Sequence, residues 1–457
     1  MNRKLIKTLI FLVDLIILEV SLILVLLARY GSDELVQEWR RHVVLFSGLA
    51  LIWLMTFYIA ELYNFLQPLN YRRFLVCMAI NIGVAVSFFY IFPMASIAPK
   101  TNLLLLVVIF SVLFSLWREL FTYLLDKLGV RRPVVLIGLD EHSLYMAKRI
   151  IENPRLGYSL EALVVGQRDP ASKEIVPDWL RNSSALLMSS MDELIDYLED
   201  ERIHSIVVSE TWYNDIYQEL YKLFPKGIRF YQLSSFWEQV EETIPVYTTN
   251  ETWFLQNMSR GPNTVYMPFK RFFDLFFGVV LLPPIFVLSL ITAIMVKVSS
   301  RGPAIFKQTR VGLANRPFTI YKFRSMRQDA EKFGAQWATE NDPRITRVGT
   351  FIRLVRLDEL PQLINVFRGE MSFIGPRPER PEFEQELSKE IPHYNLRHLV
   401  KPGLTGWAQV KYRYGSSVED SATKLMYDLY YVKNISPVLD MKIVLKTVLT
   451  ILTKSGR

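Results

Sequence analysis

The sequence predicts a helical membrane bundle, then a parallel α/β domain, then an α+β domain that opens with a re-entrant membrane helix. Three observations predict this architecture. Of the 457 residues, 51% are hydrophobic, and many gather in long apolar runs. Between these runs, short β-branched segments alternate with helical ones. The predicted boundaries are 1–125 for the bundle, 126–245 for the α/β domain, 246–267 for a linker and 268–457 for the last domain.

Four apolar runs in the first part are each about long enough to cross a hydrocarbon core of roughly 30 Å. They cover residues 5–28, 43–63, 74–94 and 102–123. Lys and Arg residues lie before the first run, between the second and third, and after the fourth, so both ends of the bundle are expected in the cytoplasm. Asp14 in the first run has two interpretations, a functional acid or a member of an ion pair inside the bundle.

The α/β domain begins with the predicted strand PVVLIG, which ends at Gly138. A dinucleotide-binding fold would continue with G-x-G-x-x-G. Here the second and third glycines are missing, and Asp140 and Glu141 place negative charge where a pyrophosphate would bind. The pattern predicts a Rossmann-like domain that binds no dinucleotide and that serves spacing, dimerisation or regulation.

The predicted linker, 246–267, contains several turn formers. The apolar run after it opens with Lys270 and Arg271 and is long enough to cross a membrane. Pro283 and Pro284 near its middle remove two backbone donors and predict a kink or a break. Four crossings leave the α/β domain in the cytoplasm, and a fifth would export the last domain. A re-entrant helix over 268–299 keeps both domains on one side.

Charge and cysteine content narrow the classes of partner. The net charge of +8 suits an anionic leaflet or a diphosphate, and the apolar runs argue against nucleic acid. The single cysteine, Cys77, excludes intramolecular disulfides and a cysteine-based zinc site. The five histidines show no spacing typical of metal ligands.

The densest group of charged and turn-forming residues lies between residues 353 and 381. At its centre, Asp358 and Glu359 precede Pro361, which suits the first position of a helix. The acid pair is therefore expected at a helix N-terminus, where a carboxylate stays ionised and can act as a nucleophile. Adjacent helical residues point about 100° apart, so the neighbouring carboxylate can face a metal. An isolated Asp-Glu pair, however, is more often a helix cap beside a solvated acid.

Five motifs around Asp358 and Glu359 favour a catalytic role for the pair over a helix cap. In chain order they are KFRSM, NDPRITRVG, LDELPQL, GEMSFIGPRP and KPGLTGWAQV. Together they resemble the bacterial sugar transferase family, the monotopic polyprenyl-phosphate phosphoglycosyltransferases, over roughly residues 268 to 457. The long form of this family has a membrane bundle and a Rossmann-like domain before the catalytic domain. In the family the helix break commonly lies about one turn later than Pro283-Pro284.

The resemblance implies transfer of a sugar phosphate from a UDP-sugar to undecaprenyl phosphate, with release of UMP. It implies Asp358 as the nucleophile, Mg²⁺ as the cofactor and Glu359 as the metal ligand. For the long form it favours UDP-glucose or UDP-galactose and the first step of exopolysaccharide, capsule or O-antigen assembly. The expected location is the bacterial inner membrane, in contact with the lipid bilayer and with the catalytic domain on the cytoplasmic face. Whether the chain forms a homodimer stays open.

Several basic residues are candidate substrate ligands. They are Lys322, Arg324, Arg353, Arg377, Lys270 and Arg271. Lys322 and Arg324 alternate with Phe323 and would share one face of a strand. Arg377 is held in a rigid turn by Gly375 and two prolines, which lowers the entropy cost of binding phosphate. Arg377 and Arg324 are expected to contribute more than Arg353.

Three questions stay open: the role of Lys270 and Arg271, the position of the C-terminal helix, and the class of the protein. Lys270 and Arg271 either orient the polyprenyl phosphate or anchor the helix. The helix predicted over 437–454 either lies on the membrane surface or packs into the domain. A membrane scaffold that senses nucleotides without catalysis and a nucleotide-sugar oxidoreductase are the rival functions. The intact Asp-Glu pair argues against the first, and the missing glycines argue against the second.

Overall fold

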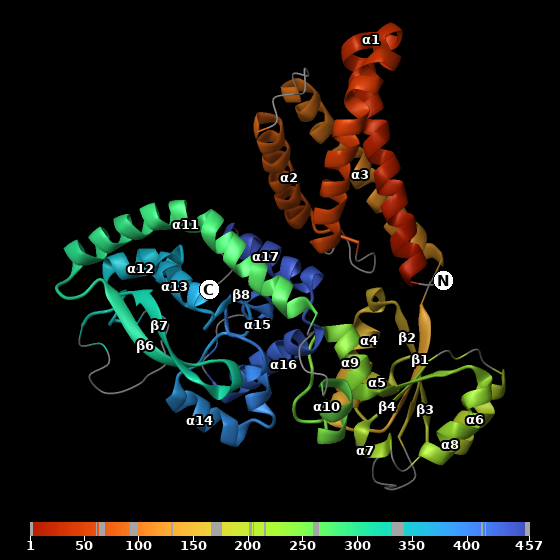
Figure 1. Cartoon of the computed structure of the whole chain (residues 1–457). Coiled ribbons are helices and arrows are strands. Elements are labelled where there is room, and N and C mark those ends of the chain that lie inside the picture. The colour runs from red at the N-terminus through yellow and green to blue at the C-terminus, as the bar shows by residue number, and fades with distance from the viewer. Residues whose placement is uncertain are drawn as a thin grey trace. The chain divides into compact units, whose positions relative to one another are not determined.

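The computed structural model consists of two compact units, Met1–Tyr231 and Gln232–Arg457 (Figure 1). The residues that it describes are 3–60, 62–63, 69–91, 99–128, 131–165, 176–200, 203, 205–213, 216–258, 265–328, 330, 342–412, 415 and 417–452. Parts of several predicted features lie outside these ranges. They include Glu61 of the second apolar run, residues 92–94 of the third run, residues 166–175 of the α/β domain, residues 259–264 of the linker, Asn341 of the NDPRITRVG motif and residues 453–454 of the C-terminal helix.

The first unit begins with a helical bundle formed by α1 (Arg3–Ile59), α2 (Tyr71–Ile91) and α3 (Pro99–Leu128). Within α1, Gly31 has φ 76° and leaves the helical region. Ser47 Oγ donates to Glu19 Oε1 at 2.7 Å, whereas a straight helix would place residues so far apart in sequence about 40 Å from each other. The chain therefore reverses at Gly31 (Figure 1), and α1 holds the first predicted apolar run and most of the second.

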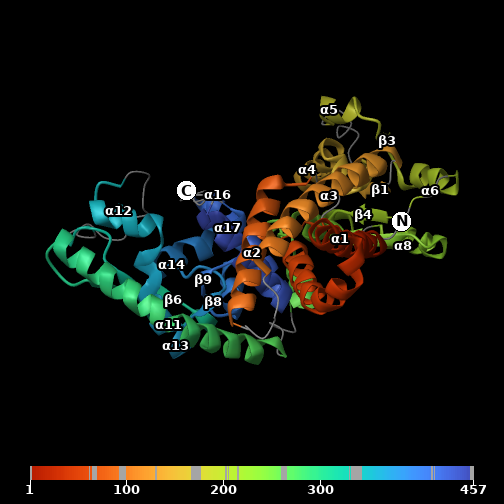
Figure 2. The same cartoon turned by 90° about the horizontal axis from the view of Figure 1, so that it is seen from above.

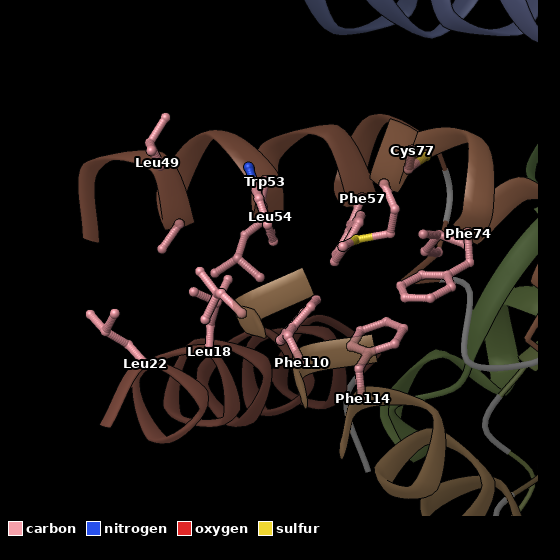
Figure 3. Packing of buried hydrophobic residues seen from close by; sticks show 14 of the residues in the cluster. Leu18, Leu22, Leu49, Trp53, Leu54, Phe57, Phe74, Cys77, Phe110 and Phe114 are labelled. Atoms are coloured by element: carbon pink, nitrogen blue, oxygen red, sulfur yellow. The ribbon is translucent and has the colours of Figure 1, made fainter. Parts of the chain in front are cut away.

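Aromatic and aliphatic side chains fill the interior of the bundle (Figure 3). The rings of Phe74 and Phe114 stack with centroids 4.9 Å apart, and Phe57 lies against Phe114 at 5.3 Å. Inside the same bundle, Arg118 Nη2 donates to Asp14 Oδ2 at 2.7 Å, and both side chains are buried. The ion pair is therefore the interpretation of Asp14 that the structure supports.

Among the described residues, four helical stretches are long and apolar enough to cross a membrane. They are Thr8–Ile59, Tyr71–Phe89, Thr101–Leu124 and Tyr266–Ser299. The first overlaps two of the predicted runs, so each of the five predicted apolar runs overlaps one of these stretches.

A five-stranded sheet follows in the first unit. Its strands are β1 (Arg132–Ile137), β2 (Tyr158–Val164), β3 (Leu186–Met188), β4 (Ser205–Val208) and β5 (Arg229–Gln232). Their order is β3-β2-β1-β4-β5, with parallel pairing of β1 to β2 and β4, and of β2 to β3. The helices between strands are α4 (Glu141–Glu152), η1 (Pro154–Leu156), α5 (Asp178–Arg181), α6 (Met191–Asp200), α7 (Glu210–Tyr213), α8 (Tyr217–Lys222) and η3 (Phe224–Lys226). The predicted parallel α/β sheet is confirmed.

The second unit is α+β. Its helices are α9 (Leu233–Glu241), α10 (Glu251–Met258), α11 (Tyr266–Ser299), η4 (Leu313–Asn315), α12 (Arg347–Leu354), η5 (Leu357–Gln362), α13 (Leu363–Arg368), α14 (Pro381–Glu390), η6 (Tyr394–Leu399), α15 (Trp407–Lys411), α16 (Val418–Asn434) and α17 (Pro437–Leu452). The strands β6 (Ile305–Val311) and β7 (Pro317–Phe323) form an antiparallel hairpin. Two short strands, β8 (Ser372–Ile374) and β9 (Gly403–Thr405), pair in parallel.

The segment predicted as a linker belongs to the core of the second unit. Val246 and Trp253 are each only 1% exposed, and they pack in one cluster with Trp407 and Leu429. The Trp407 indole N–H also donates to the carbonyl of Glu242 at 3.1 Å. The boundary between the units lies at Tyr231, upstream of the predicted one, because these apolar side chains find their partners in the C-terminal helices.

α11 is one curved helix in both views (Figures 1 and 2), and Pro283 and Pro284 lie within it. The proline pair therefore does not end the helix. Its buried residues lie near its two ends, from Tyr266 to Gly278 and at Thr292 and Val296. Most apolar side chains of its middle are exposed, from Val279 through Ile291, but Ile285 is half-buried and packs against the core cluster that contains Ile320 and Leu363. α11 thus packs on the second unit at both ends and at Ile285, and the opposite face of its middle is exposed.

α17 has one face packed into the domain and another face exposed, so it fits both positions that the sequence left open. Leu439 and Ile443 are buried in the same core cluster as Trp407. Val438, Met441 and Val444 on another side of the helix are exposed. Packing into the domain is therefore confirmed, and contact with a membrane surface stays a prediction.

Candidate active site

The acid pair lies in a short 3₁₀ helix and not at the start of an α-helix. α12 ends at Leu354, Arg356 adopts a left-handed conformation with φ 58°, and η5 begins at Leu357. Asp358 and Glu359 occupy the first turn of η5, as the predicted helix N-terminus requires. Pro361 lies inside η5 and not at its first position, because the left-handed turn at Arg356 begins the helix earlier. With 3.0 residues per turn, neighbouring side chains point about 120° apart.

Three cations surround the carboxylate of Glu359. Arg377 Nη2 donates to its Oε1 at 3.0 Å, and Lys322 Nζ lies 4.0 Å from the same oxygen. Arg356 Nη1 lies 3.7 Å from Oε2. Burial alone would raise the pKa of Glu359, but Arg377, Lys322 and Arg356 outweigh it and lower the pKa to about 2. Glu359 is therefore a fully ionised anchor for positive side chains.

Asp358 differs from its neighbour. Within the part of the chain that the structure describes, it has no hydrogen bond and no ion pair. Burial, reinforced by the charge of Glu359, raises its pKa to about 6, while Lys322, Arg353 and Arg377 act in the opposite direction. At pH 7 the carboxylate is mostly ionised and has no cation bound to it.

Lys322 reaches the pair from the hairpin. It lies near the end of β7, and its side chain is 17% exposed. Burial and the nearby charge of Arg377 lower its pKa to about 8, although Glu359 favours the charged form. Lys322 is thus a cation that titrates just above neutral pH.

Arg377 reaches the pair from the GPRP turn. Its side chain is 42% exposed, so one edge of the guanidinium contacts Glu359 while the rest is open to a ligand. Glu359 raises the pKa of Arg377 further above its ordinary value. The hydrogen bond to Glu359 orients this guanidinium beside the acid pair.

Two arginines that precede the pair also lie close to it. Arg353 is among the charges that act on Asp358, and its Nη1 is buried without a hydrogen-bond partner among the described residues. Arg356 was not among the predicted ligands, yet it contacts Glu359. The signal that could have found it is the spacing of three residues between Arg356 and Glu359, which places the two on one side of a helical turn.

Arg324 lies elsewhere. Its Nη2 donates to Ser300 O at 2.8 Å and to Ser300 Oγ at 3.0 Å, and the side chain is buried. A side chain at Gly302 would meet Arg324 Nη1 at 2.2 Å, so the guanidinium fills the turn after α11. No contact joins Arg324 to the acid pair among the described residues. Its role as a phosphate ligand stays a prediction that these contacts do not favour.

Lys270 and Arg271 hold the first half of α11 on the domain. Lys270 Nζ lies 2.6 Å from Asp440 Oδ2 of α17, and both groups are buried. Arg271 donates to the carbonyls of Val366 and Phe367, at 2.6 and 2.9 Å, at the end of α13. These contacts match the anchoring alternative, and they do not bring either residue to the acid pair.

The residue types at the site fit Mg²⁺. Among the described residues, no group of three or more His, Cys, Asp or Glu side chains is arranged so that it could hold a metal ion by itself. Magnesium in phosphoryl-transfer sites, however, commonly takes one or two carboxylates, and substrate phosphates and waters complete its octahedron. Asp358 and Glu359 supply two adjacent carboxylates, so a metal could bind there with a diphosphate. Magnesium itself stays a prediction.

Comparison with known proteins places this site in a family. Residues 265–454 match the family model described as bacterial sugar transferase. The chain is 49% identical over 195 residues to a UDP-N-acetylgalactosamine-undecaprenyl-phosphate N-acetylgalactosaminephosphotransferase of Aeromonas hydrophila, which is 43% of this chain and 46% of that one. It is 34% identical over 333 residues to a UDP-glucose:undecaprenyl-phosphate glucose-1-phosphate transferase of Xanthomonas campestris pv. campestris, 70% of this chain and 66% of that one. The chain thus spans less than two thirds of the length of these two relatives.

A shorter relative is matched almost entirely. The exopolysaccharide production protein PSS of Rhizobium leguminosarum bv. phaseoli is 40% identical over 194 residues, which is 40% of this chain and 96% of that protein. The chain belongs to the bacterial sugar transferase family.

Proposed function

We propose that the protein transfers a hexose-1-phosphate from a UDP-sugar to undecaprenyl phosphate, releases UMP and forms a covalent aspartyl phosphosugar on the way. The observation that carries this proposal is the asymmetry of the acid pair. Glu359 is bound by cations, whereas Asp358 presents an ionised carboxylate with no hydrogen bond or ion pair to a described residue. The names of the Aeromonas and Xanthomonas relatives, both undecaprenyl-phosphate sugar phosphotransferases, support it.

In the first step an oxygen of Asp358 attacks the β-phosphorus of the UDP-sugar. The bond between this phosphorus and the oxygen that bridges to the α-phosphate breaks, and UMP leaves with that oxygen and the bonding electrons. A dianionic diphosphate repels a carboxylate, so positive charge must surround the phosphoryl oxygens. Arg377 and Lys322 supply it, because both already lie within 4.0 Å of Glu359 beside Asp358.

In the second step an oxygen of undecaprenyl phosphate attacks the phosphorus of the aspartyl phosphosugar. The bond from this phosphorus to Asp358 breaks, and the carboxylate is restored. Glu359 would hold Mg²⁺, which when bound supplies further neutralisation of the diphosphate oxygens. Glu359 also keeps Arg377 oriented through the 3.0 Å hydrogen bond in both steps.

The lipid substrate requires a site at the membrane, and the contacts of α11 support a re-entrant helix. Lys270 near one end binds Asp440, and Val296 near the other end packs with Phe323 and Ile352. If α11 spanned the bilayer, these two ends would lie on opposite sides, yet both contact one folded unit. We therefore propose that the catalytic domain lies on the cytoplasmic face of the inner membrane, with the exposed face of the middle of α11 in lipid.

Isotope exchange tests the covalent step. The wild-type protein in detergent should exchange labelled UMP into UDP-sugar without undecaprenyl phosphate, and its kinetics should be ping-pong. Asp358→Asn should lower the rates of UMP exchange and of sugar-phosphate transfer by roughly 10⁴-fold or more, since an amide cannot attack the phosphorus. Glu359→Gln should also be severely impaired, and its residual rate should respond to Mg²⁺ concentration.

Other outcomes of the same experiment would contradict the proposal. Sequential kinetics, no exchange and substantial activity in Asp358→Asn would remove Asp358 as the nucleophile. No transfer of any sugar by the wild-type protein would favour the scaffold function instead. The sugar is the finer part of the proposal, so the exchange is run with UDP-glucose, UDP-galactose and UDP-N-acetylgalactosamine, and we expect one of the first two.

A further inference from the structure

The turn that carries Arg377 is held by donors from four elements. The carbonyls of residues 374, 376, 377 and 378 each accept a hydrogen bond. The donors, in this order, are Tyr431 Oη at 3.2 Å, Gly403 N at 2.9 Å, Arg397 Nη2 at 2.8 Å and Arg310 Nη1 at 3.1 Å. They come from α16, β9, η6 and β6. The backbone of this turn is therefore fixed by parts of the chain that lie far from it in sequence.

Arg397 is the donor that acts on Arg377 itself. Its guanidinium is buried and binds three groups at once. Nη2 donates to the Arg377 carbonyl and to Asp428 Oδ2, both at 2.8 Å, and Nη1 donates to Tyr394 Oη at 2.6 Å. Asp428, only 2% exposed, supplies the compensating charge. No contact joins Arg397 or Asp428 to Asp358 or Glu359 among the described residues.

Stability alone does not account for this pair. The cost of removing two charges from water offsets most of their attraction in the interior, and apolar side chains of similar volume often replace such a pair without loss. An apolar side chain at position 397, however, could not donate to the carbonyl of Arg377. The planar fork of an arginine can serve a carbonyl, a carboxylate and a hydroxyl together. The pair is therefore suited to fixing a geometry.

We propose that Arg397 and Asp428 are a positioning pair for the transfer reaction. Asp428 orients Arg397, Arg397 holds the peptide carbonyl of Arg377, and the guanidinium of Arg377 is thereby kept 3.0 Å from Glu359. This inference rests on the proposed function, because Arg377 matters here as a ligand of the diphosphate. A displacement of about 1 Å in such a group can cost about 10²-fold in rate.

The test uses the full-length protein in detergent and the UMP exchange assay. Arg397→Lys keeps the charge opposite Asp428 but loses the fork, so kcat should fall by about 10- to 100-fold while KM for the UDP-sugar changes by less than about threefold. Arg397→Met with Asp428→Leu removes the pair without leaving a buried unpaired charge. This double variant should unfold thermally close to wild type and should lose as much exchange as Arg397→Lys.

A double-mutant cycle separates positioning from a merely structural role. If Arg397 acts through Arg377, then Arg397→Lys should lower exchange by less than about threefold in an Arg377→Ala background. The matched control is Lys433, which forms a partly buried ion pair with Glu238 at 2.6 Å and also contacts Asn257 and Trp253, none of which belongs to the turn. Lys433→Met should leave exchange within about twofold of wild type.

Two results overturn the inference. One is exchange within about twofold of wild type in both Arg397→Lys and the Arg397→Met, Asp428→Leu protein. The other is an effect of Arg397→Lys that multiplies in full with that of Arg377→Ala. In both cases the wild-type protein still exchanges UMP, and the proposed function stands. Absence of exchange in the wild type would instead overturn the proposed function and this inference with it.

Discussion

Two adjacent carboxylates, Asp358 and Glu359, acquire opposite properties from their surroundings. Glu359 faces Arg377, Lys322 and Arg356, and its pKa is lowered to about 2. Asp358 is partly buried beside that negative charge, and its pKa is raised to about 6. Environments that move two pKa values apart are typical of sites where two carboxyl groups have different tasks. The pattern supports the proposal that Glu359 anchors the cations and that Asp358 is the group that reacts.

The activity should therefore depend on pH in a bell shape. In a ping-pong scheme, kcat/KM for the UDP-sugar reports the free enzyme and the first step alone. Asp358 must be ionised, so the rate should fall below about pH 6. Lys322 must be protonated, so it should also fall above about pH 8. Initial rates from pH 5 to 9.5 at constant ionic strength measure this profile.

Lys322→Arg is the control for the alkaline limb. A guanidinium stays protonated throughout this range, so the fall above about pH 8 should disappear in this variant, while the acidic limb remains. An alkaline limb that persists in Lys322→Arg would show that another group causes it. A flat acidic limb would contradict the assignment to Asp358.

At the residue scale, sequence reasoning found the residues whose partners are close in the motifs. Asp358, Glu359, Lys322 and Arg377 were all expected near the reacting phosphorus, and the structure brings them together. Arg324 was expected beside Lys322, but it contacts Ser300, and its alternation with Lys322 gave no information about that partner. Its role as a phosphate ligand stays a prediction. A single strand pattern shows which side chains share a face, but not which of them a distant turn will cover.

At the scale of elements, periodicity predicted the apolar helices and the parallel sheet, because each is encoded within its own segment. Periodicity could not predict that the segment expected to be a linker would belong to the core of the second unit. Trp253 lies in a segment with turn formers, and its burial depends on α15, α16 and α17. The same holds for η5, where the left-handed Arg356 sets the start of the helix.

The turn after β1 gives an element-scale prediction. Gly138 has φ 105°, and a side chain there would meet Ser209 Cβ at 2.8 Å. Ser209 Oγ donates to Asp140 Oδ2, and Asp140 Oδ1 caps α4 at Ser143 N. The edge of the sheet where a pyrophosphate would bind is thus occupied by the chain's own groups and carries an acid.

We therefore expect no dinucleotide to bind there. Calorimetry of the full-length protein in detergent should give no heat of binding with NAD, NADP or FAD, while a UDP-sugar should bind and confirm that the sample is native. Micromolar affinity for any of the three dinucleotides would contradict the expectation. Loss of that affinity in Ser209→Trp would then locate it at the Gly138 turn.

At the scale of the whole molecule, the topology of α11 decides whether the chemistry occurs on the side where UDP-sugars are made. The helix has 34 residues and would be about 51 Å long if straight, well beyond a hydrocarbon core of roughly 30 Å. Its curvature and its contacts with the second unit at both ends and at Ile285 instead allow the exposed face of its middle to enter the bilayer while both ends stay on one side. The proline pair favours this course, because each proline removes one backbone hydrogen bond from the helix.

Cysteine labelling tests this topology, and the structure determines where the cysteines go. Lys270 and Gly302 are poor sites, because Lys270 is paired with Asp440 and a side chain at Gly302 would collide with Arg324. Pro268 and Arg301 are exposed neighbours of these positions, and Ser32 is exposed at the reversal of α1. Each is changed to cysteine in a Cys77→Ser background, and active variants are treated with a membrane-impermeant maleimide in intact spheroplasts.

A re-entrant α11 predicts that Ser32→Cys is labelled in intact spheroplasts, because the positive-inside rule places the ends of the bundle in the cytoplasm and its α1 reversal outside. Pro268→Cys and Arg301→Cys should both resist the reagent until the membrane is permeabilised. Labelling of Arg301→Cys from outside, with Pro268→Cys still protected, would mean that α11 spans. The acid pair would then face away from the cytoplasm, and transfer from a cytoplasmic UDP-sugar would require a different site.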